Sequence, residues 1–268
     1  MPLKGNQMSL EKKIEELELK YLNKYYFFLK FTLDEILEGL KTRDKIYNDW
    51  EGLYGTNISD FSTGAERVIY SLLNGKGIGT PNSAPVGSDL FFEVNDAFIH
   101  IDLKTVGATL SPIPNEKTNN IGDFSKNIFI GTNQNSYSAD IFVYEGRENQ
   151  ISRSYKSHLP PIYNRADKNK SKPCLTYFIT MLYDKDTLET LVINLLCMPN
   201  GLLNRIYAHR PIKAGKNLDK ARFNFSRTPD FELLNEEKRV KIIYFQENMN
   251  KKYLKSLKWQ YDLFRSQK

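Results

Sequence analysis

The sequence predicts an α/β fold in a single domain: a central mixed β-sheet flanked by helices, with N-terminal and C-terminal helices added. Strand-like runs rich in β-branched and aromatic residues occupy the middle of the chain, and amphipathic helical patterns flank them. The chain has 268 residues, of which 40% are hydrophobic, and it shows no internal repeat and no interdomain linker. We expect a helical N-terminal part over 1–60, a core over 61–200 and a basic, partly helical part over 201–268.

Each expected element follows from its pattern. Apolar residues at helical spacing from Leu10 to Leu40 indicate either one long helix or two helices with a break near Phe31-Thr32. A second amphipathic pattern indicates a helix over 63–73. Its Gly-rich continuation is a connector, because a phosphate-binding loop would follow a strand and open a helix. Further along, we expect strands at 127–130, 139–144, 175–182 and 188–198, polar loops at 147–172 and 200–228, and a helical tail over 235–264.

The segment 87–105 predicts a β-hairpin. Two β-rich runs flank Asn95-Asp96, a dipeptide that accepts the backbone conformation of a tight turn. With a two-residue loop there, Val94 faces Ala97, and the two numbers of every cross-strand pair add to 191. Asp89 therefore sits opposite Asp102.

Alternation along the two strands separates an apolar face from a polar one. The apolar face carries Leu90, Phe92, Val94, Ile99, Ile101 and Leu103. The opposite face carries Asp89, Phe91, Glu93, Phe98, His100, Asp102 and Lys104.

Two opposed carboxylates destabilise a hairpin unless a divalent cation or a shared proton lies between them. Lys104 lies two residues beyond Asp102 on the same face, so its ammonium reaches the same point. Two carboxylates and a lysine around one point suit hydrolysis of a phosphodiester, since a hard cation takes carboxylate oxygens and neutralises the scissile phosphate. The structural alternative is a strand pair whose polar face meets solvent, with Lys104 simply pairing Asp102.

The positive charge is unevenly distributed. The formal net charge is +6, but 201–268 holds sixteen Lys or Arg against seven Asp or Glu, and 147–172 holds seven against two. A basic second half interleaved with Tyr, Phe and Asn is the electrostatic pattern of a polyanion binder. The alternative is a solvated basic face without a partner.

Other classes of protein are disfavoured. The two cysteines, Cys174 and Cys197, cannot form a disulfide scaffold or a four-cysteine zinc site, and they fit a reducing compartment. No apolar run is long enough to cross a bilayer, so we expect a soluble, cytoplasmic protein with no membrane partner. The histidines at 100, 158 and 209 lack metal-ligand spacing, although His100 could support the polar face of the hairpin.

At the hairpin the chain resembles the PD-(D/E)XK nuclease superfamily, specifically its type II restriction endonucleases. In that family an Asp at a strand start is followed, in an adjacent strand, by acid-x-Lys, and Asp89, Asp102 and Lys104 match these positions. The family's proline before the first Asp is replaced by Ser88. Many members carry a Glu on the preceding helix, which Glu66 matches, although Glu66 could instead stabilise the first turn of its helix.

The resemblance implies a restriction-endonuclease-like core, a magnesium-dependent reaction and a double-stranded DNA substrate. The metal-binding positions would be Asp89, Asp102 and Leu103, Lys104 would orient or activate the water, and Glu66 would join the catalytic set. It also implies 5′-phosphate and 3′-hydroxyl ends, a homodimer acting on a palindrome, and a cognate DNA methyltransferase as genetic partner.

Two segments are candidates for DNA contacts. The loop 131–137 is dense in amide side chains, which can read adenine, and it includes Asn133, Gln134, Asn135 and Tyr137. The basic segment 205–227 supplies phosphate contacts and one or two base contacts through Arg205, Arg210, Lys216, Arg222 and Arg227.

Two other functions remain open at this point. One is a DNA repair or recombination nuclease of the same superfamily, which would recognise DNA structure rather than a short sequence. The other is a non-catalytic DNA-binding protein whose hairpin acids only face solvent.

Overall fold

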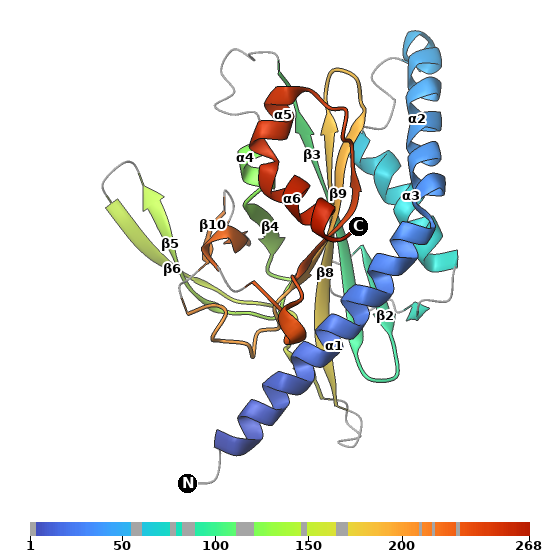
Figure 1. Ribbon diagram of the computed structural model, residues 1–268. Helices are drawn as coiled ribbons and strands as arrows, with labels where there is room; N and C mark the ends of the chain where they lie inside the picture. Colours follow the sequence, from blue (N-terminus) through green and yellow to red (C-terminus); the bar gives the residue numbers. More distant parts are fainter. Residues whose placement is uncertain are drawn as a thin grey trace.

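The computed structural model describes residues 4–54, 61–75, 79–81, 89–110, 121–145, 149–164, 171–208, 211–215, 218–228 and 231–268. Its architecture is a central mixed sheet with helices on both faces and a two-stranded arm to one side (Figure 1). No helix in these ranges is sufficiently long and apolar to traverse a bilayer.

The central sheet runs in the order β1-β2-β3-β8-β9-β12, and β7 adds to β8 outside this path. Only the β3–β8 pair is parallel, so the sheet is mixed as the sequence predicts. The bounds are β1 Thr80–Pro81, β2 Leu90–Glu93, β3 Phe98–Ala108, β7 Ile162–Tyr163, β8 Lys172–Asp184, β9 Thr190–Met198 and β12 Val240–Phe245.

Three helices cover one face of this sheet: α1 (Lys4–Phe31), α2 (Leu33–Tyr54) and α3 (Phe61–Gly75). Their apolar side chains form one core with alternate residues of β2, β3, β8 and β9. Of the two alternatives left open by the sequence, the structure has two N-terminal helices with a break at Thr32, whose hydroxyl donates to the Phe28 carbonyl at 3.1 Å.

The other face of the sheet packs on a second core. It is covered by the three-stranded sheet β10-β11-β4, by the short helix α4 (Ile121–Phe124), and by α5 (Lys251–Ser256) and α6 (Lys258–Ser266). The small sheet is antiparallel and consists of β10 (Ile212–Ala214), β11 (Lys220–Asn224) and β4 (Asn127–Gly131). The arm is the hairpin β5 (Ala139–Glu145) and β6 (Asn149–Tyr155), which Figure 1 shows standing apart from the central sheet.

The structure corrects three expectations. The tail over 235–264 is not helical throughout, because Val240–Phe245 forms the edge strand β12, and η4 (Leu234–Glu236) precedes it. A bulge between Ile242 and Tyr244 interrupts the alternation of apolar and polar residues along this strand. The apolar spacing there looks nearly helical, and for this reason the sequence analysis predicted a helix. The two polar loops also contain structure: β6 and β7 lie within 147–172, and β10, β11 and η3 (Phe225–Arg227) lie within 200–228.

Candidate active site

The predicted hairpin register is confirmed. Leu90 pairs with Ile101, Phe92 pairs with Ile99, and the Val94 N–H donates to the Ala97 carbonyl at 3.0 Å. Continuing this register by one residue sets Asp89 opposite Asp102. The two carboxyl groups do meet, since a hydrogen bond joins their side chains.

Most of the second face of the hairpin is buried, namely Phe91, Phe98, His100 and Asp102, whereas Asp89 is exposed and Lys104 is half-buried. This face therefore does not simply meet solvent. Phe91 and Phe98 stack on each other with ring centroids 5.6 Å apart, in a small cluster with Leu159 and Cys174. Asp102 is only 1% exposed. A carboxylate in such a place must be compensated, because removing a charge from water without a partner is costly.

The two acids have opposite electrostatic character. Burial and the neighbouring Asp89 raise the pKa of Asp102 to about 7, against the opposing effect of Lys104. Burial acts upward on the pKa of Asp89 too, but hydrogen bonds from Asp102, Tyr70 and the Leu103 N–H outweigh it and hold that pKa below its ordinary value. Burial therefore favours the neutral form of Asp102, whereas the hydrogen bonds to Asp89 favour the ionised form of that acid.

Lys104 completes the predicted trio. Its ammonium forms an ion pair with Asp102, and its side chain is 30% exposed while that of Asp102 is 1% exposed. Lys104 thus reaches from buried Asp102 toward the surface, which is the position required of a group that contacts an incoming substrate.

Tyr70 is a residue of the site that the sequence analysis missed. It lies on α3 next to Asp89, donating a hydrogen bond to that carboxylate, while its hydroxyl accepts the Leu103 N–H at 3.3 Å. The Leu103 N–H also lies 3.0 Å from the Asp89 carboxylate. Tyr70 follows Glu66 by one helical turn, and this spacing is the signal that could have found it.

Glu66 lies on the same side of α3, where Ser62 donates to its carboxylate at 3.5 Å. It does not complete a three-acid site: across the described ranges, no group of three or more His, Cys, Asp or Glu side chains could hold a metal ion. A cation at this point would have two carboxylates, Asp89 and Asp102, and would take its other ligands from the backbone, from water or from substrate. Two acids against one lysine leave excess negative charge, and hard carboxylate oxygens are what Mg²⁺ prefers. The donor set therefore fits such an ion.

Gln134 contacts the site from the loop between β4 and β5. Its side-chain NH₂ donates to the second oxygen of Asp102 at 2.8 Å, and its side-chain carbonyl accepts the Gly131 N–H at 2.7 Å. Asp102 is thus held by Lys104 on one carboxylate oxygen and by Gln134 on the other.

A cleft of about 570 Å³ opens beside Lys104. One wall is the end of β4 and the following loop, including Thr132, Asn133 and Gln134, and His158 and Lys220 also line it. A second hollow of about 280 Å³ shares Lys104 and Phe129 and extends along β3 toward Gly107. Lys104 therefore stands where the two hollows meet.

The residues of the loop 131–137 that were predicted to contact DNA have different surroundings in the structure. Asn133 faces the cleft, as base readout requires. Asn135 is fully buried, donates to Gly131 and Tyr155 and accepts from the Tyr137 N–H, so its side chain does not face the cleft. Tyr137 stacks on Tyr207 with ring centroids 3.6 Å apart.

The basic residues that were predicted to contact DNA also differ in their surroundings. Arg205 is engaged by Glu15 and Glu11 of α1. The Arg222 guanidinium lies over the Phe129 ring at 4.7 Å, beside the hollow next to Lys104, and Arg227 is exposed on η3. Arg210 and Lys216, like Ser88, lie outside the described residues.

His100 is fully buried beside the acids, and neither ring nitrogen has a hydrogen-bond partner among the described residues. Burial lowers the pKa of His100 to about 3, against the opposing charge of Asp89. It is therefore a neutral imidazole. His158 lines the cleft, and His209 falls outside the described ranges.

Comparison with known proteins gives a family and a fold. The family model for the N-terminal domain of the type II restriction enzyme MwoI matches residues 10–187, and the model for the central domain of that enzyme matches 190–245. No curated protein matches the sequence.

Among solved structures, the chain is similar to the restriction endonuclease BglI bound to its DNA recognition sequence. The TM-score is 0.63 at 18% identity, covering 89% of this chain and 94% of that one. The chain is also similar to the tetrameric restriction endonuclease SfiI bound to cognate DNA, with a TM-score of 0.47 at 14% identity, covering 85% and 87% of the two chains. The likeness to BglI confirms the predicted fold class, a mixed sheet flanked by helices.

Proposed function

The chain belongs to the MwoI family of type II restriction enzymes, and from this premise we propose that Asp89, Asp102 and Lys104 are its catalytic residues and that Mg²⁺ is its metal. The observation that carries the proposal is the pair of acids, buried Asp102 and exposed Asp89, beside Lys104 at the mouth of the cleft. The same trio supports assignment to the PD-(D/E)XK superfamily.

Each side chain at this site would have a separate role in the reaction. Asp89 and Asp102 would hold Mg²⁺, with the Leu103 backbone beside them, and the ion would supply charge neutralisation at the scissile phosphate. Lys104 contacts Asp102 and lines the cleft, so its ammonium can orient the attacking water and stabilise its deprotonated form. Tyr70 and Gln134 hold the two acids in place. Glu66 stays a candidate, one helical turn from Tyr70.

The cleft beside Lys104 would receive the sugar-phosphate backbone. Lys220 and Arg222 are placed to contact phosphates near the catalytic trio, and Arg227 is exposed further along the same segment. Asn133 and Gln134 both line the cleft. The Gln134 amide already donates to Asp102, so we propose that Asn133 rather than Gln134 contacts a base. Arg210 and Lys216 belong to the same basic segment.

Three further features of the proposal follow from the family. The products would carry 5′-phosphate and 3′-hydroxyl ends. A homodimer would act on a two-fold symmetric site, and a DNA methyltransferase would protect the host's own copies of that site. A repair or recombination nuclease would instead cut branched or damaged DNA.

The test is incubation of the purified chain with a genome-length phage DNA in Mg²⁺, Mn²⁺, Ca²⁺ or EDTA. We expect discrete fragments with Mg²⁺ or Mn²⁺, none in EDTA, and binding without cutting in Ca²⁺. Cleavage in EDTA would overturn the metal assignment. Specific binding without cleavage in any metal would favour the non-catalytic alternative.

A further inference from the structure

We infer that Gln134 is a positioning residue that holds Asp102 for metal binding and links it to the wall of the cleft. This inference rests on the proposed function of Asp102 and deepens it. It assigns Gln134 to the catalytic centre through Asp102, in place of the base contact that the sequence predicts for it.

The orientation of the Gln134 amide is fixed by its own contacts. The side-chain carbonyl accepts from the Gly131 N–H at 2.7 Å, and the Gln134 N–H donates back to the Gly131 carbonyl at 3.1 Å. Because a backbone N–H can only donate, the oxygen must face Gly131, and the NH₂ must face Asp102. The hydrogen bond to Asp102, at 2.8 Å, is therefore a donation to its carboxylate.

This donation serves an acid that has few other means of orientation. Asp102 lies on β3 with one oxygen near Lys104, a flexible side chain that is partly exposed. Gln134 fixes the other oxygen from a separate element. Two independent anchors define the plane of a carboxylate, which is what a metal ligand needs before the ion arrives.

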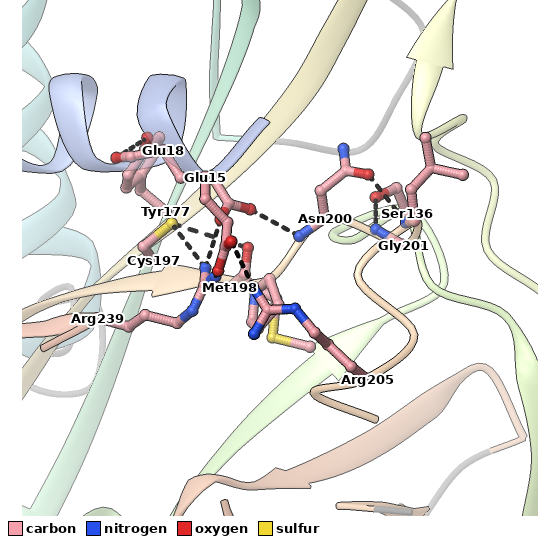
Figure 2. A network of polar contacts seen from close by, with 12 residues as sticks. Glu15, Glu18, Ser136, Tyr177, Cys197, Met198, Asn200, Gly201, Arg205 and Arg239 are labelled. Carbon is pink, nitrogen blue, oxygen red and sulfur yellow. Dashed lines mark hydrogen bonds and ion pairs between the residues drawn. The ribbon is translucent and has the colours of Figure 1, made fainter. Parts of the chain in front are cut away.

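The loop that carries Gln134 is itself fixed on its far side. Asn135 is buried and bonded to Gly131 and Tyr155. Behind it, the Gly201 N–H donates to the Ser136 hydroxyl at 2.8 Å, and a Cβ at position 201 would lie 2.1 Å from the Ser136 carbonyl oxygen. Figure 2 shows this contact continuing through Asn200 to the buried pair of Glu18 and Arg239.

The near side of the loop faces the cleft, with Thr132 and Asn133 directly before Gln134 in the chain. A contact from DNA to Asn133 therefore acts one residue away from the group that holds Asp102. The structure thus offers a short path by which occupancy of the cleft can affect the geometry of a metal ligand.

The test compares Gln134→Met with wild type. Methionine keeps the length of the side chain but removes both amide hydrogen bonds. We expect the Mg²⁺ concentration for half-maximal cleavage of phage DNA to rise about tenfold or more, as is usual when a residue that orients a metal ligand is lost. The affinity for Ca²⁺, measured by calorimetry on the protein without DNA, should fall to a similar extent.

Asn133→Ala is the matched control, because it alters the same loop without touching Asp102. It should lower DNA affinity or base discrimination while leaving the affinity for Ca²⁺ in the absence of DNA as in wild type. If Gln134 only stabilises the loop, Gln134→Met would lower the melting temperature and DNA affinity but leave both metal measurements unchanged, which would overturn the inference. Wild-type protein that neither binds Ca²⁺ nor cleaves would instead overturn the proposed function.

Discussion

Two charge clusters, each with a buried centre, lie on opposite faces of the central sheet, and their charges are compensated in different ways. On the helical face, Glu18 and Arg239 are both fully buried and paired at 2.5 Å. Glu15 and Arg205 extend this cluster, and the Asn200 N–H donates to Glu18 at 2.7 Å (Figure 2). The two buried acids, Glu15 and Glu18, both contact guanidinium groups, and the cluster is balanced in this sense; Arg205 also contacts Glu11 at the edge of the cluster.

The proposed catalytic cluster is not balanced. Asp89 and Asp102 have a single lysine partner, Lys104, and burial raises the pKa of Asp102. The charges of the first cluster are typical of a group of ion pairs that stabilises the fold. The excess negative charge of the second cluster is typical of a cation-binding site. On the proposed assignment, buried charge alone does not mark the functional site of this protein, and uncompensated charge beside a cleft does.

The largest expected effect is on catalysis. Lys104→Ala and Asp102→Ala should each lower the cleavage rate by about three orders of magnitude, because each removes several kcal/mol of transition-state stabilisation. Binding of cognate DNA in Ca²⁺, measured by gel shift, should change little for Lys104→Ala. Lys258→Ala is the control, since its exposed ion pair with Asp262 lies on α6. Full cleavage by Lys104→Ala would remove Lys104 from the active site.

The balanced cluster should respond in stability rather than in chemistry. Arg239→Met leaves Glu18 buried without its partner, so we expect a loss of about 3–5 kcal/mol in the free energy of unfolding, measured with urea. The double variant Arg239→Met, Glu18→Leu should recover much of that loss, because Glu18 is then no longer present as a buried carboxylate without its partner. Breaking the exposed Lys258–Asp262 pair should cost about 0.5 kcal/mol or less. Equal losses of unfolding free energy for the Glu18–Arg239 pair and the Lys258–Asp262 pair would show that burial does not make the first pair more important for stability.

The pH dependence of stability should distinguish the catalytic acids. The pKa of Asp102 is raised to about 7 by burial, from an ordinary value of 3.8. Between these pH values the folded protein binds a proton at Asp102 that the unfolded chain has released, so stability without metal falls as pH rises. The slope attributable to this group is at most about 1.4 kcal/mol per pH unit.

Asp102→Asn should remove that slope while leaving the remaining pH dependence intact. The measurement is urea unfolding in EDTA across this pH range, with wild type and variant compared at each pH. Parallel curves for the two proteins would show that Asp102 titrates normally.

The smallest expected effect is at Tyr70. Tyr70→Phe removes the hydroxyl that donates to Asp89 but keeps the ring packed on the core. We expect up to a tenfold rise in the Mg²⁺ concentration for half-maximal cleavage, with little change in DNA affinity. Tyr163→Phe, an exposed tyrosine on β7, serves as the control. Identical metal dependence in both variants would show that the Leu103 N–H and Asp102 suffice to hold Asp89.

The sequence by itself determined the local geometry of the hairpin. Strict alternation and a two-residue Asn95-Asp96 turn allow one register, because a slip by one residue would turn the apolar face away from the core. Asp89, Asp102 and Lys104 therefore follow from short-range rules. The helix that became α3 follows equally from local apolar spacing, whereas that spacing left open whether the N-terminal helix breaks at Thr32.

Only the tertiary structure decided which other residues join the site. Gln134 lies 32 residues from Asp102, and no local pattern distinguishes its amide from that of Asn135, which is buried. Arg205 looks like a phosphate ligand in the sequence, yet the acidic residues of α1 engage it. Val240–Phe245 became a strand because the edge of β9 was available to pair with it. Contacts between distant segments depend on which surfaces the folded chain brings together, and neither residue type nor spacing along the chain encodes that.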